Sequence, residues 1–206
     1  MKRINKLIRF TISYMRIFVI NMFYKNVSLH LGFNSIISCN SRIELNTSRH
    51  NASLFIGRSS RILNNTCLRI SNSSLELGRH CELNHAKIQA NGGKIKIGDN
   101  VFFNSGCIVI STSSIEIGDG SAFGTNVSIY DHDHIYVKNG PQPWNENKST
   151  PIKIGKNCWI GCNTIILRGS CIGDNCVIAA GTIIKGSIPD HTLVYNEKNI
   201  IMKEIQ

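Results

Sequence analysis

Two histidines stand in a short acidic run near the middle of the chain, which reads Tyr130-Asp131-His132-Asp133-His134. Imidazole titrates near neutral pH, so a histidine can take a proton from a hydroxyl group and return it within one reaction. A neighbouring carboxylate such as Asp131 can orient the ring and favour its charged form. The pattern therefore indicates proton transfer, although an exposed histidine taken alone is more often inert.

A His-x-His pair is also a plausible pair of metal ligands, which is the second alternative at this position. A zinc site needs three or four protein ligands. His80, His85 and His191 are not spaced to join the pair. Cys158 and Cys162 are separated by three residues, and no second cysteine pair completes a site around them. We therefore expect no bound metal.

A polar segment follows the histidines and reads YVKNGPQPWNENKSTP from Tyr136 to Pro151. It interrupts a regular pattern of Ile-Gly or Leu-Gly pairs, because Gly118 and Gly155 are 37 residues apart, whereas the other neighbouring glycines of this series are 18 to 21 apart. We expect a protruding loop over residues 136–151. A long irregular loop on a regular scaffold is usually functional, and a tolerated surface insertion is the alternative.

The elements that must hold these residues are repeats of six. Six consecutive hexads begin with isoleucine and read IGKNCW, IGCNTI, ILRGSC, IGDNCV, IAAGTI and IKGSIP, from Ile154 to Pro189. A helix has a period of 3.6 and a simple amphipathic strand a period of 2, so neither explains this spacing. A period of six indicates a short strand followed by a turn, with three such sides closing one triangular coil.

The hexads also predict which side chains point inward. The isoleucine fills the interior, and the fifth position holds a small or medium residue beside it: Cys158, Thr164, Ser170, Cys176 and Thr182. Glycine or asparagine near the corners supplies the unusual backbone angles of the turns. If Ile129 points inward, the same rule places Asp133 at the small inward position and directs His132 and His134 outward.

The earlier coils are 20 residues long rather than 18, and we interpret the pairs Ser73-Ser74, Gly92-Gly93 and Ser113-Ser114 as two-residue bulges at a corner. Stacked coils bury one continuous aliphatic column, and each coil needs its neighbours to do so. We expect a solenoid domain over residues 26–192 and a C-terminal cap over residues 193–206.

Residues 1–25 are both basic and amphipathic. Apolar residues recur at roughly helical spacing between basic residues, and Arg9 and Arg16 interrupt the apolar stretch that a signal peptide would need. We expect a helix that either packs against its own domain or rests on an anionic membrane surface.

The amino-acid composition limits the classes of molecule that the protein is expected to bind. Hydrophobic residues make up 42% of the 206 residues and charged residues 17%, which excludes a disordered polar tail. A formal charge of +10 suggests an anionic partner, and nucleic acid ranks last because no nucleic-acid-binding motif occurs. No apolar run reaches 18 residues without a charge, so a membrane span is not expected. We interpret the eight cysteines as reduced thiols of a cytoplasmic protein.

The run from Pro151 to Gly161, PIKIGKNCWIG, preceded by His134 and a loop, resembles the acetyl-CoA-dependent O-acetyltransferases with hexapeptide repeats. That family includes galactoside and maltose acetyltransferases and the O-acetyltransferases of bacterial capsule and lipopolysaccharide, including polysialic acid. The resemblance covers roughly residues 95–192. It implies a left-handed parallel β-helix, an all-β triangular prism to which the N-terminal helix is added.

The resemblance also implies roles for single residues. His134 matches the general base of the family, with His132 as second choice, and Asn104 matches an asparagine that contacts the acceptor. Residues implied in acetyl-CoA binding are Trp159, Cys162, Ala180 and Lys185. The chain departs from the family's C-terminal G-x-P-A-[K/R] segment, since residues 196–200 read NEKNI.

The family further implies a homotrimer whose sites lie between two prisms. We expect transfer of acetyl from acetyl-CoA to a hydroxyl of a bacterial surface saccharide, with an anionic acceptor weakly preferred because of the positive charge. The alternatives are N-acetylation of an amino sugar, a non-catalytic scaffold or glycan-binding module, and a metal-dependent hydratase. We expect the protein in the cytoplasm, with peripheral membrane contact through residues 1–25 as a further expectation.

Overall fold

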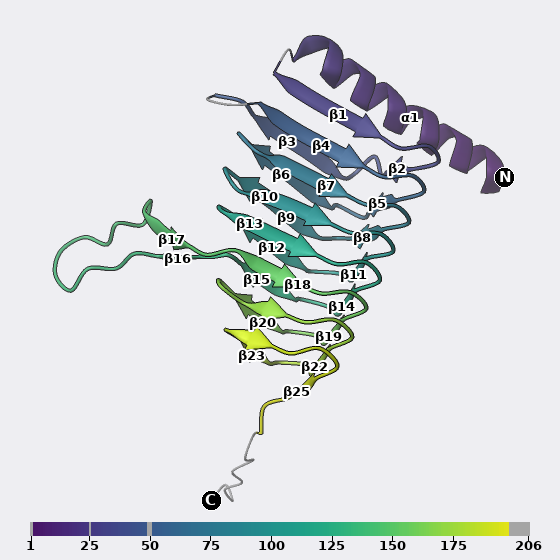
Figure 1. Cartoon of the computed structure of the whole chain (residues 1–206). Helices are drawn as coiled ribbons and strands as arrows, with labels where there is room; N and C mark the ends of the chain where they lie inside the picture. Colours follow the sequence, from purple (N-terminus) through teal and green to yellow (C-terminus); the bar gives the residue numbers. More distant parts are fainter. Residues whose placement is uncertain (1, 25, 49–50, 198–206) are drawn as a thin grey trace, which may run out of the picture.

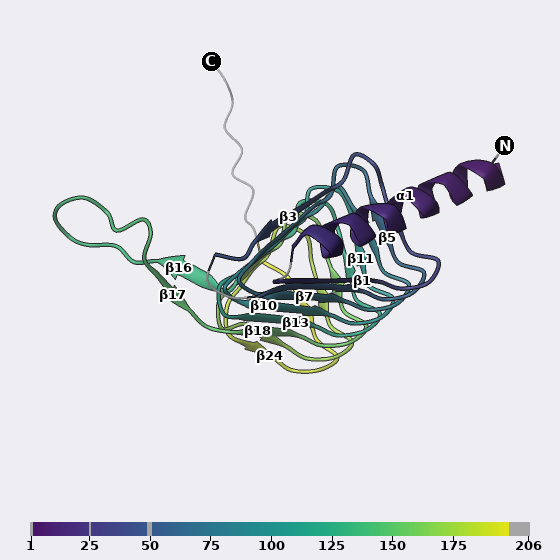
Figure 2. The same ribbon diagram turned by 90° about the horizontal axis from the view of Figure 1, so that it is seen from above.

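The computed structural model of the chain describes the backbone of residues 2–24, 26–48 and 51–197, and side chains from residue 11 onward. Helix α1 (Lys2–Phe23) is followed by a column of stacked coils (Figure 1). Each full circuit of the chain adds one strand to each of three parallel sheets, and the end-on view shows the coils superimposed (Figure 2). The predicted three-sided parallel solenoid of hexapeptide repeats is confirmed.

The three sheets are named here in the order in which the chain enters them. Sheet A contains β1 (Val27–Leu31), β4 (Ala52–Ile56), β7 (Ser74–Leu77), β10 (Lys94–Ile97), β13 (Ser114–Ile117), β18 (Ile152–Ile154), β21 (Cys171–Ile172) and β24 (Ser187–Ile188). Sheet B contains β2 (Ile36–Ile37), β5 (Arg61–Leu63), β8 (Glu82–Asn84), β11 (Phe102–Phe103), β14 (Ala122–Phe123), β19 (Trp159–Ile160), β22 (Val177–Ile178) and β25 (Leu193–Val194). Sheet C contains β3 (Arg42–Asn46), β6 (Cys67–Ser71), β9 (Lys87–Asn91), β12 (Ile108–Ser111), β15 (Ser128–Tyr130), β20 (Ile165–Leu167) and β23 (Ile183–Ile184).

The interior is the aliphatic column that the hexads predict. All six hexad isoleucines are buried, and the residues of the fifth position, from Cys158 to Thr182, are buried beside them. On sheet B, phenylalanines take the place of Ile160 in the two coils before it, and the rings of Phe103 and Phe123 stack with centroids 4.4 Å apart. The packed interior therefore runs the length of the solenoid and fixes which side chains face solvent.

The corners carry residues with left-handed backbone angles, as predicted. Asparagine and glycine dominate, and Asn126, Asn163 and Gly181 follow one another along the corner between sheets B and C with φ near +60° to +70°. His80, His85 and His191 also occupy corner positions, with φ between 49° and 57°. Three of the seven histidines thus serve turns and lie outside the acidic run.

The glycine of each Ile-Gly or Leu-Gly pair directly follows a strand of sheet A and lies directly over the next coil. A Cβ atom placed on Gly118 would come within 2.6 Å of the backbone carbon of Gly155, and one on Gly57 within 2.5 Å of the carbonyl of Gly78. These contacts are shorter than any side chain tolerates. The repeated glycine is therefore required by the distance between coils.

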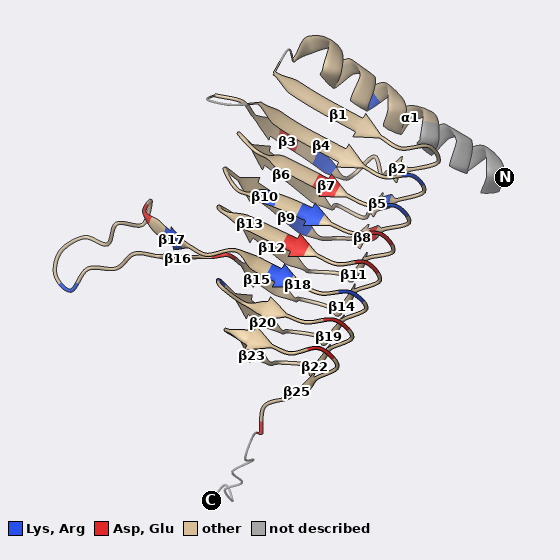
Figure 3. Ribbon diagram, in the orientation of Figure 1, with Lys and Arg blue, Asp and Glu red and all other residues tan. Residues whose placement is uncertain are grey.

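The outer face of sheet A carries a column of alternating charge. Lys96 pairs in register with Glu76 on one side and Glu116 on the other, and Glu116 with Lys153 (Figure 3). Opposite charges on neighbouring strands favour this register over a slipped one.

The interruption between Gly118 and Gly155 is a hairpin that leaves the column at the corner between sheets C and A (Figures 1 and 2). Its arms are β16 (His132–His134) and β17 (Asn147–Ser149), which pair antiparallel. The protrusion therefore begins at His132, before the predicted start of the loop at residue 136. At the other end, β25 (Leu193–Val194) lies just beyond the predicted domain boundary at residue 192. Most of the predicted cap, residues 198–206, lies outside the described residues.

Helix α1 packs across the first coil and covers its open edge. This agrees with the expectation that the N-terminal helix packs against its own domain. In the part of the chain that the structure describes, no helix combines the length and the hydropathy needed to cross a membrane.

Candidate active site

Asp131, and not Asp133, points into the solenoid, which corrects the predicted register. Its side chain is 0% exposed, whereas that of Asp133 is 44% exposed. Strand β15 continues the pleat beyond Ile129, so the next inward position comes two residues later and not four. Asp131 lies beside Ser111 of the coil before, which is also buried.

The Asp131 carboxylate is held by hydrogen bonds from the neighbouring coil. It accepts from Ser111 Oγ at 2.7 Å, from the backbone N–H of Thr112 at 2.9 Å and from that of Ser113 at 2.8 Å. The Thr112 hydroxyl contacts it at 3.3 Å. These hydrogen bonds satisfy both oxygens of the buried carboxylate and fix the start of the hairpin.

His132 is held by this carboxylate. Its Nδ1 lies 3.2 Å from Asp131 Oδ1, and its side chain is 14% exposed. Tyr130 and His134 meet the ring edge to face, with centroids 6.3 Å and 6.1 Å away. His132 is therefore an oriented ring with little room to meet a large substrate.

His134 lies on the same side of β16 and is exposed. Its neighbour across the hairpin is Asn147. Both histidines therefore project outward, as predicted, and His134 is the one that solvent reaches more freely. The intervening Asp133 forms an ion pair with Arg168 of the next coil, and Arg168 also donates to the hydroxyl of Thr150 at 3.3 Å. This pair anchors both arms of the hairpin to the solenoid.

Trp159, Cys162 and Ala180 lie together along a different edge. Trp159 is the outward residue of β19 on sheet B, and its side chain is 62% exposed. The carbonyl of Cys162 accepts a hydrogen bond from the N–H of Gly181, which follows the exposed Ala180. These are three of the four residues implied in acetyl-CoA binding. They lie on sheet B or just after its strands, at the corner between sheets B and C.

The thiol of Cys162 differs from the buried cysteine thiols in the direction of its pKa shift. A hydrogen bond from the Thr125 side chain lowers the pKa of the Cys162 thiol. By contrast, burial raises the pKa of both Cys81 and Cys107 to about 11, so these two are inert core thiols at neutral pH. Cys39 and Cys171 are exposed, and no disulfide joins any pair of described cysteines.

Asn104 directly follows β11. It lies on the same edge as Trp159 and Cys162, but two coils closer to the N-terminal end of the solenoid. Its Oδ1 accepts a hydrogen bond from the backbone N–H of Ser105 at 2.8 Å. Lys185 lies apart from Ala180, because it follows β23 on the outer face of sheet C, where it is exposed. Lys185 therefore does not join the cluster within one chain.

The two halves of the candidate site do not meet within one chain. About six residues of extended chain separate the corner at Thr125 from Asp131, which corresponds to roughly 20 Å across sheet C. The histidines lie on one edge of the prism, and Trp159, Cys162, Ala180 and Asn104 lie on another.

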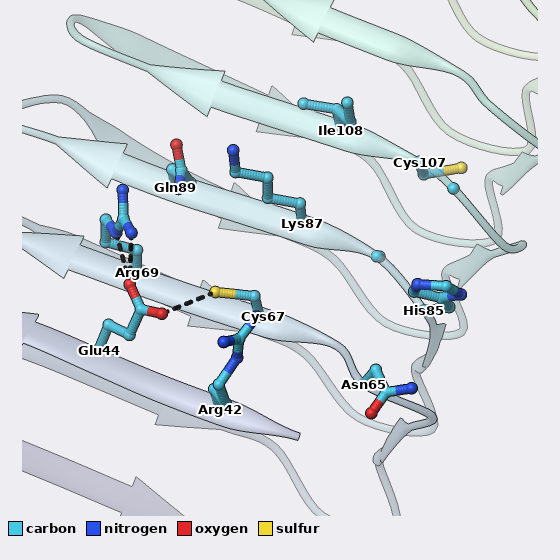
Figure 4. A pocket seen from close by; sticks show the side chains of 12 residues that line it. Arg42, Glu44, Asn65, Cys67, Arg69, His85, Lys87, Gln89, Cys107 and Ile108 are labelled. Atoms are coloured by element: carbon cyan, nitrogen blue, oxygen red, sulfur yellow. Dashed lines mark hydrogen bonds and ion pairs between the residues drawn. The ribbon is translucent and has the colours of Figure 1, made fainter. Parts of the chain in front are cut away.

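A basic groove of about 440 Å³ opens on the outer face of sheet C (Figure 4). Arg42, Arg69 and Lys87 line it, and Arg69 is paired with Glu44 at 2.6 Å. The Arg69 hydrogen bond lowers the pKa of Glu44, so this carboxylate is charged at neutral pH. Gln89 also lines the groove, and its Nε2 is buried without a hydrogen-bond partner among the described residues.

Sequence reasoning missed three features here: the inward Asp131, the Asp133–Arg168 pair and the groove. For Asp131 the sequence did contain a signal. Ser111 and Asp131 are 20 residues apart, which is the length of one early coil, so they occupy the same position in successive coils. The groove gave no linear signal, because its residues come from four successive strands of sheet C, from β3 to β12, and from the turns that precede them. No group of three or more His, Cys, Asp or Glu side chains within the described residues is arranged to hold a metal.

Comparison with known families matches two segments of the chain. Residues 151–186 match "Bacterial transferase hexapeptide (six repeats)", and residues 94–131 match "Hexapeptide repeat of succinyl-transferase". Both segments consist of coils of the solenoid, and the hairpin lies between them.

Two curated relatives come from Escherichia coli. Galactoside O-acetyltransferase is 36% identical over 135 residues, which cover 65% of this chain and 55% of that enzyme. The chain therefore spans about half the length of this relative. The protein WbbJ, named as a lipopolysaccharide biosynthesis O-acetyl transferase, is 29% identical over 71% of this chain and 80% of its own.

Among solved structures, the polySia-specific acetyltransferase NeuO superposes with a TM-score of 0.61. The superposition covers 87% of this chain and 81% of that chain at 19% identity. At this identity the likeness establishes the shared fold.

Proposed function

Because the chain belongs to the hexapeptide-repeat acetyltransferase family, we propose that it transfers the acetyl group of acetyl-CoA to a hydroxyl of a bacterial surface saccharide. His134 acts as the general base. The observation that carries the proposal is an exposed histidine at the root of a hairpin that interrupts a three-sided solenoid, with PIKIGKNCWIG leading into the next coil.

His134 suits the role of base better than His132. The His132 ring is largely covered and faces the Asp131 carboxylate, so it is suited to holding a fixed orientation beside its neighbour. The His134 ring lies 6.1 Å away and is exposed, so a hydroxyl group of a large acceptor can reach it.

In the proposed reaction, His134 takes the proton of the acceptor hydroxyl as the oxygen attacks the thioester carbonyl carbon. The resulting tetrahedral oxyanion is stabilised by backbone N–H groups that face outward at the coil corners. The C–S bond then breaks, and the imidazolium returns the proton to the leaving thiolate. The products are an O-acetylated saccharide and free CoA, and no cysteine forms a covalent intermediate.

The active unit is a homotrimer in this proposal, because His134 and Trp159 lie on different edges of one chain and a second copy is needed to bring them together. Two surfaces support this arrangement. The hairpin extends away from the solenoid with Tyr136 and Trp144 exposed, and the last coils of sheet C present Ile165, Leu167 and Ile183 outward. Exposed apolar surfaces of this kind are typical of subunit contacts.

The acceptor is an acidic saccharide. The groove of Figure 4 lies at the start of the sheet C strands, beside the corner that carries Asn104 and Cys162, where a second copy would bring its histidines. Neither Arg42 nor Lys87 forms an ion pair with any described residue, so both can bind a carboxylate of the acceptor. Acetyl-CoA and reduced thiols are both typical of the cytoplasm, where we place the reaction.

A thiol-release assay with acetyl-CoA tests the proposal. We expect the substitution His134→Ala to lower the rate of CoA release by about 10²–10⁴-fold, since a general base contributes that much. The matched variant His132→Ala should retain more activity, because it removes only the orienting neighbour. Both variants should keep the melting temperature of the parent protein within a few degrees, since neither ring lies in the aliphatic column.

The same assay distinguishes the alternatives. An acidic saccharide should release CoA faster than a neutral saccharide or an amino sugar of the same size. Faster release with the amino sugar would identify an N-acetyltransferase. Full turnover in both histidine variants would rule out the base, and the absence of thermal stabilisation by CoA would indicate a scaffold without catalytic function.

A further inference from the structure

Helix α1 has one face that is fixed to the solenoid. Ser13 Oγ donates to the carbonyl of Ile37 at 3.1 Å and accepts its N–H at 2.9 Å. Asn21 does the same for Leu29, at 2.8 and 2.9 Å. Ile17 is buried between these contacts. The helix thus satisfies strand groups at the open end of the column, and its rotation about its own axis is determined.

The opposite face is apolar and exposed. Met15, Phe18 and Met22 are 61%, 70% and 69% exposed. Ile12 and Val19 continue this stripe at helical spacing and line a shallow apolar hollow of about 440 Å³. A helix that only closed the end of a solenoid in water would carry polar residues here. Among the described residues, none covers this stripe, which is therefore a surface suited to a partner.

The charge of the same segment indicates the partner. Residues 1–25 contain six basic residues and no acidic residue: Lys2, Arg3, Lys6, Arg9, Arg16 and Lys25. Arg16 donates to two carbonyls of the first coil, so the charge argument rests on the other five. Two copies of such a segment repel each other, whereas a surface of anionic lipid attracts each basic residue near it. A basic helix with a continuous apolar stripe fits the interface between lipid headgroups and acyl chains.

We propose that α1 docks the protein onto an anionic membrane surface, with Met15, Phe18, Val19 and Met22 inserted between the headgroups. The helix then forms the end plate of the solenoid, and the coils rise away from the bilayer (Figure 1). Strand β15 is the fifth strand of sheet C from that end, four spacings of about 4.8 Å beyond β3. The histidines at the end of β15 therefore stand roughly 20 Å above the first coil. Within the proposed function, this height suits a saccharide that is attached to the membrane, but the docking itself does not depend on that function.

Sedimentation of the full chain with vesicles tests the proposal. We use vesicles of phosphatidylcholine alone and vesicles containing phosphatidylglycerol in addition. The protein should bind the anionic vesicles, bind the neutral ones at least tenfold more weakly, and leave the anionic ones as salt rises. The double substitution Met15→Ser and Phe18→Ser should weaken binding at least tenfold, because two inserted side chains are lost.

A matched control changes two exposed apolar residues far from the helix, Leu193→Ser and Tyr195→Ser, and should bind like the parent. Unchanged thermal melting of both double variants shows that they are folded. Failure of the parent to bind anionic vesicles, or equal binding by the α1 variant, would overturn the proposal. So would a change in oligomeric mass on altering α1 without a change in vesicle binding. None of these readouts involves acetyl transfer, so the proposed function can fail independently.

Discussion

At the scale of single residues, the site depends on a carboxylate that contacts no substrate in the proposed reaction. Asp131 uses its inward position to bond Ser111 and the backbone of Thr112 and Ser113, and it holds His132 from the same atoms. The sequence predicted the two outward histidines correctly because strand alternation alone determines them. The sequence predicted Asp133 as the inward aspartate, whereas the structure places Asp131 there. The hexad rule no longer applies at this point, because the chain leaves the column.

Replacing Asp131 by asparagine should lower the free energy of unfolding by about 2–3 kcal/mol, since an amide NH₂ would face buried N–H donors. Urea denaturation measures this loss. The control Asp133→Asn removes a partly exposed ion pair and should cost about 1 kcal/mol or less. Equal losses in the two variants would contradict the assigned role of Asp131.

The thiol of Cys162 gives a second test at this scale. Its lowered pKa should make it react with iodoacetamide faster than the buried thiols, whose pKa burial raises. Acetyl-CoA should slow the alkylation of Cys162 severalfold and leave that of Cys171, on sheet A, unchanged. Mass spectrometry of the modified peptides reads both rates. Equal protection of both thiols, or of neither, would remove Cys162 from the cofactor site.

At the scale of elements, the regular coils could be predicted almost completely. The isoleucine register, the fifth-position residues and the asparagine and glycine corners follow from a period of six, because every coil repeats the same local solution. The pairing of β16 with β17 could not be predicted, because it joins residues across a polar loop with no periodic signal. The basic groove was missed for a similar reason, since it forms only when four coils stack.

The stacked glycines provide the prediction at this scale. Gly118→Ala should lower stability by at least about 2 kcal/mol, because its Cβ would meet the backbone of Gly155 at 2.6 Å and the coils would have to separate. Gly140→Ala at the tip of the hairpin meets no atom within 4 Å and should cost about 1 kcal/mol, for its left-handed φ alone. Thermal denaturation of the two variants checks the order, and the reverse order would contradict the packing argument.

At the scale of the whole molecule, the chain divides its tasks along the axis of the solenoid. One end carries the apolar stripe of α1, the middle carries the hairpin and its histidines, and the last coils carry Trp159 and Ala180 (Figure 1). The prism edges keep His134 and Trp159 apart in one chain. The central claim is therefore that each site is completed by a second copy.

Mixing two inactive variants tests that claim most directly. His134→Ala and Trp159→Ala chains are unfolded together in equal amounts, refolded as mixed trimers, and assayed for CoA release at low acetyl-CoA concentration. If each site takes His134 from one copy and Trp159 from the next, about one quarter of the parental activity should return, by random assembly into closed rings. Mixed trimers that remain as inactive as either variant alone would contradict the account.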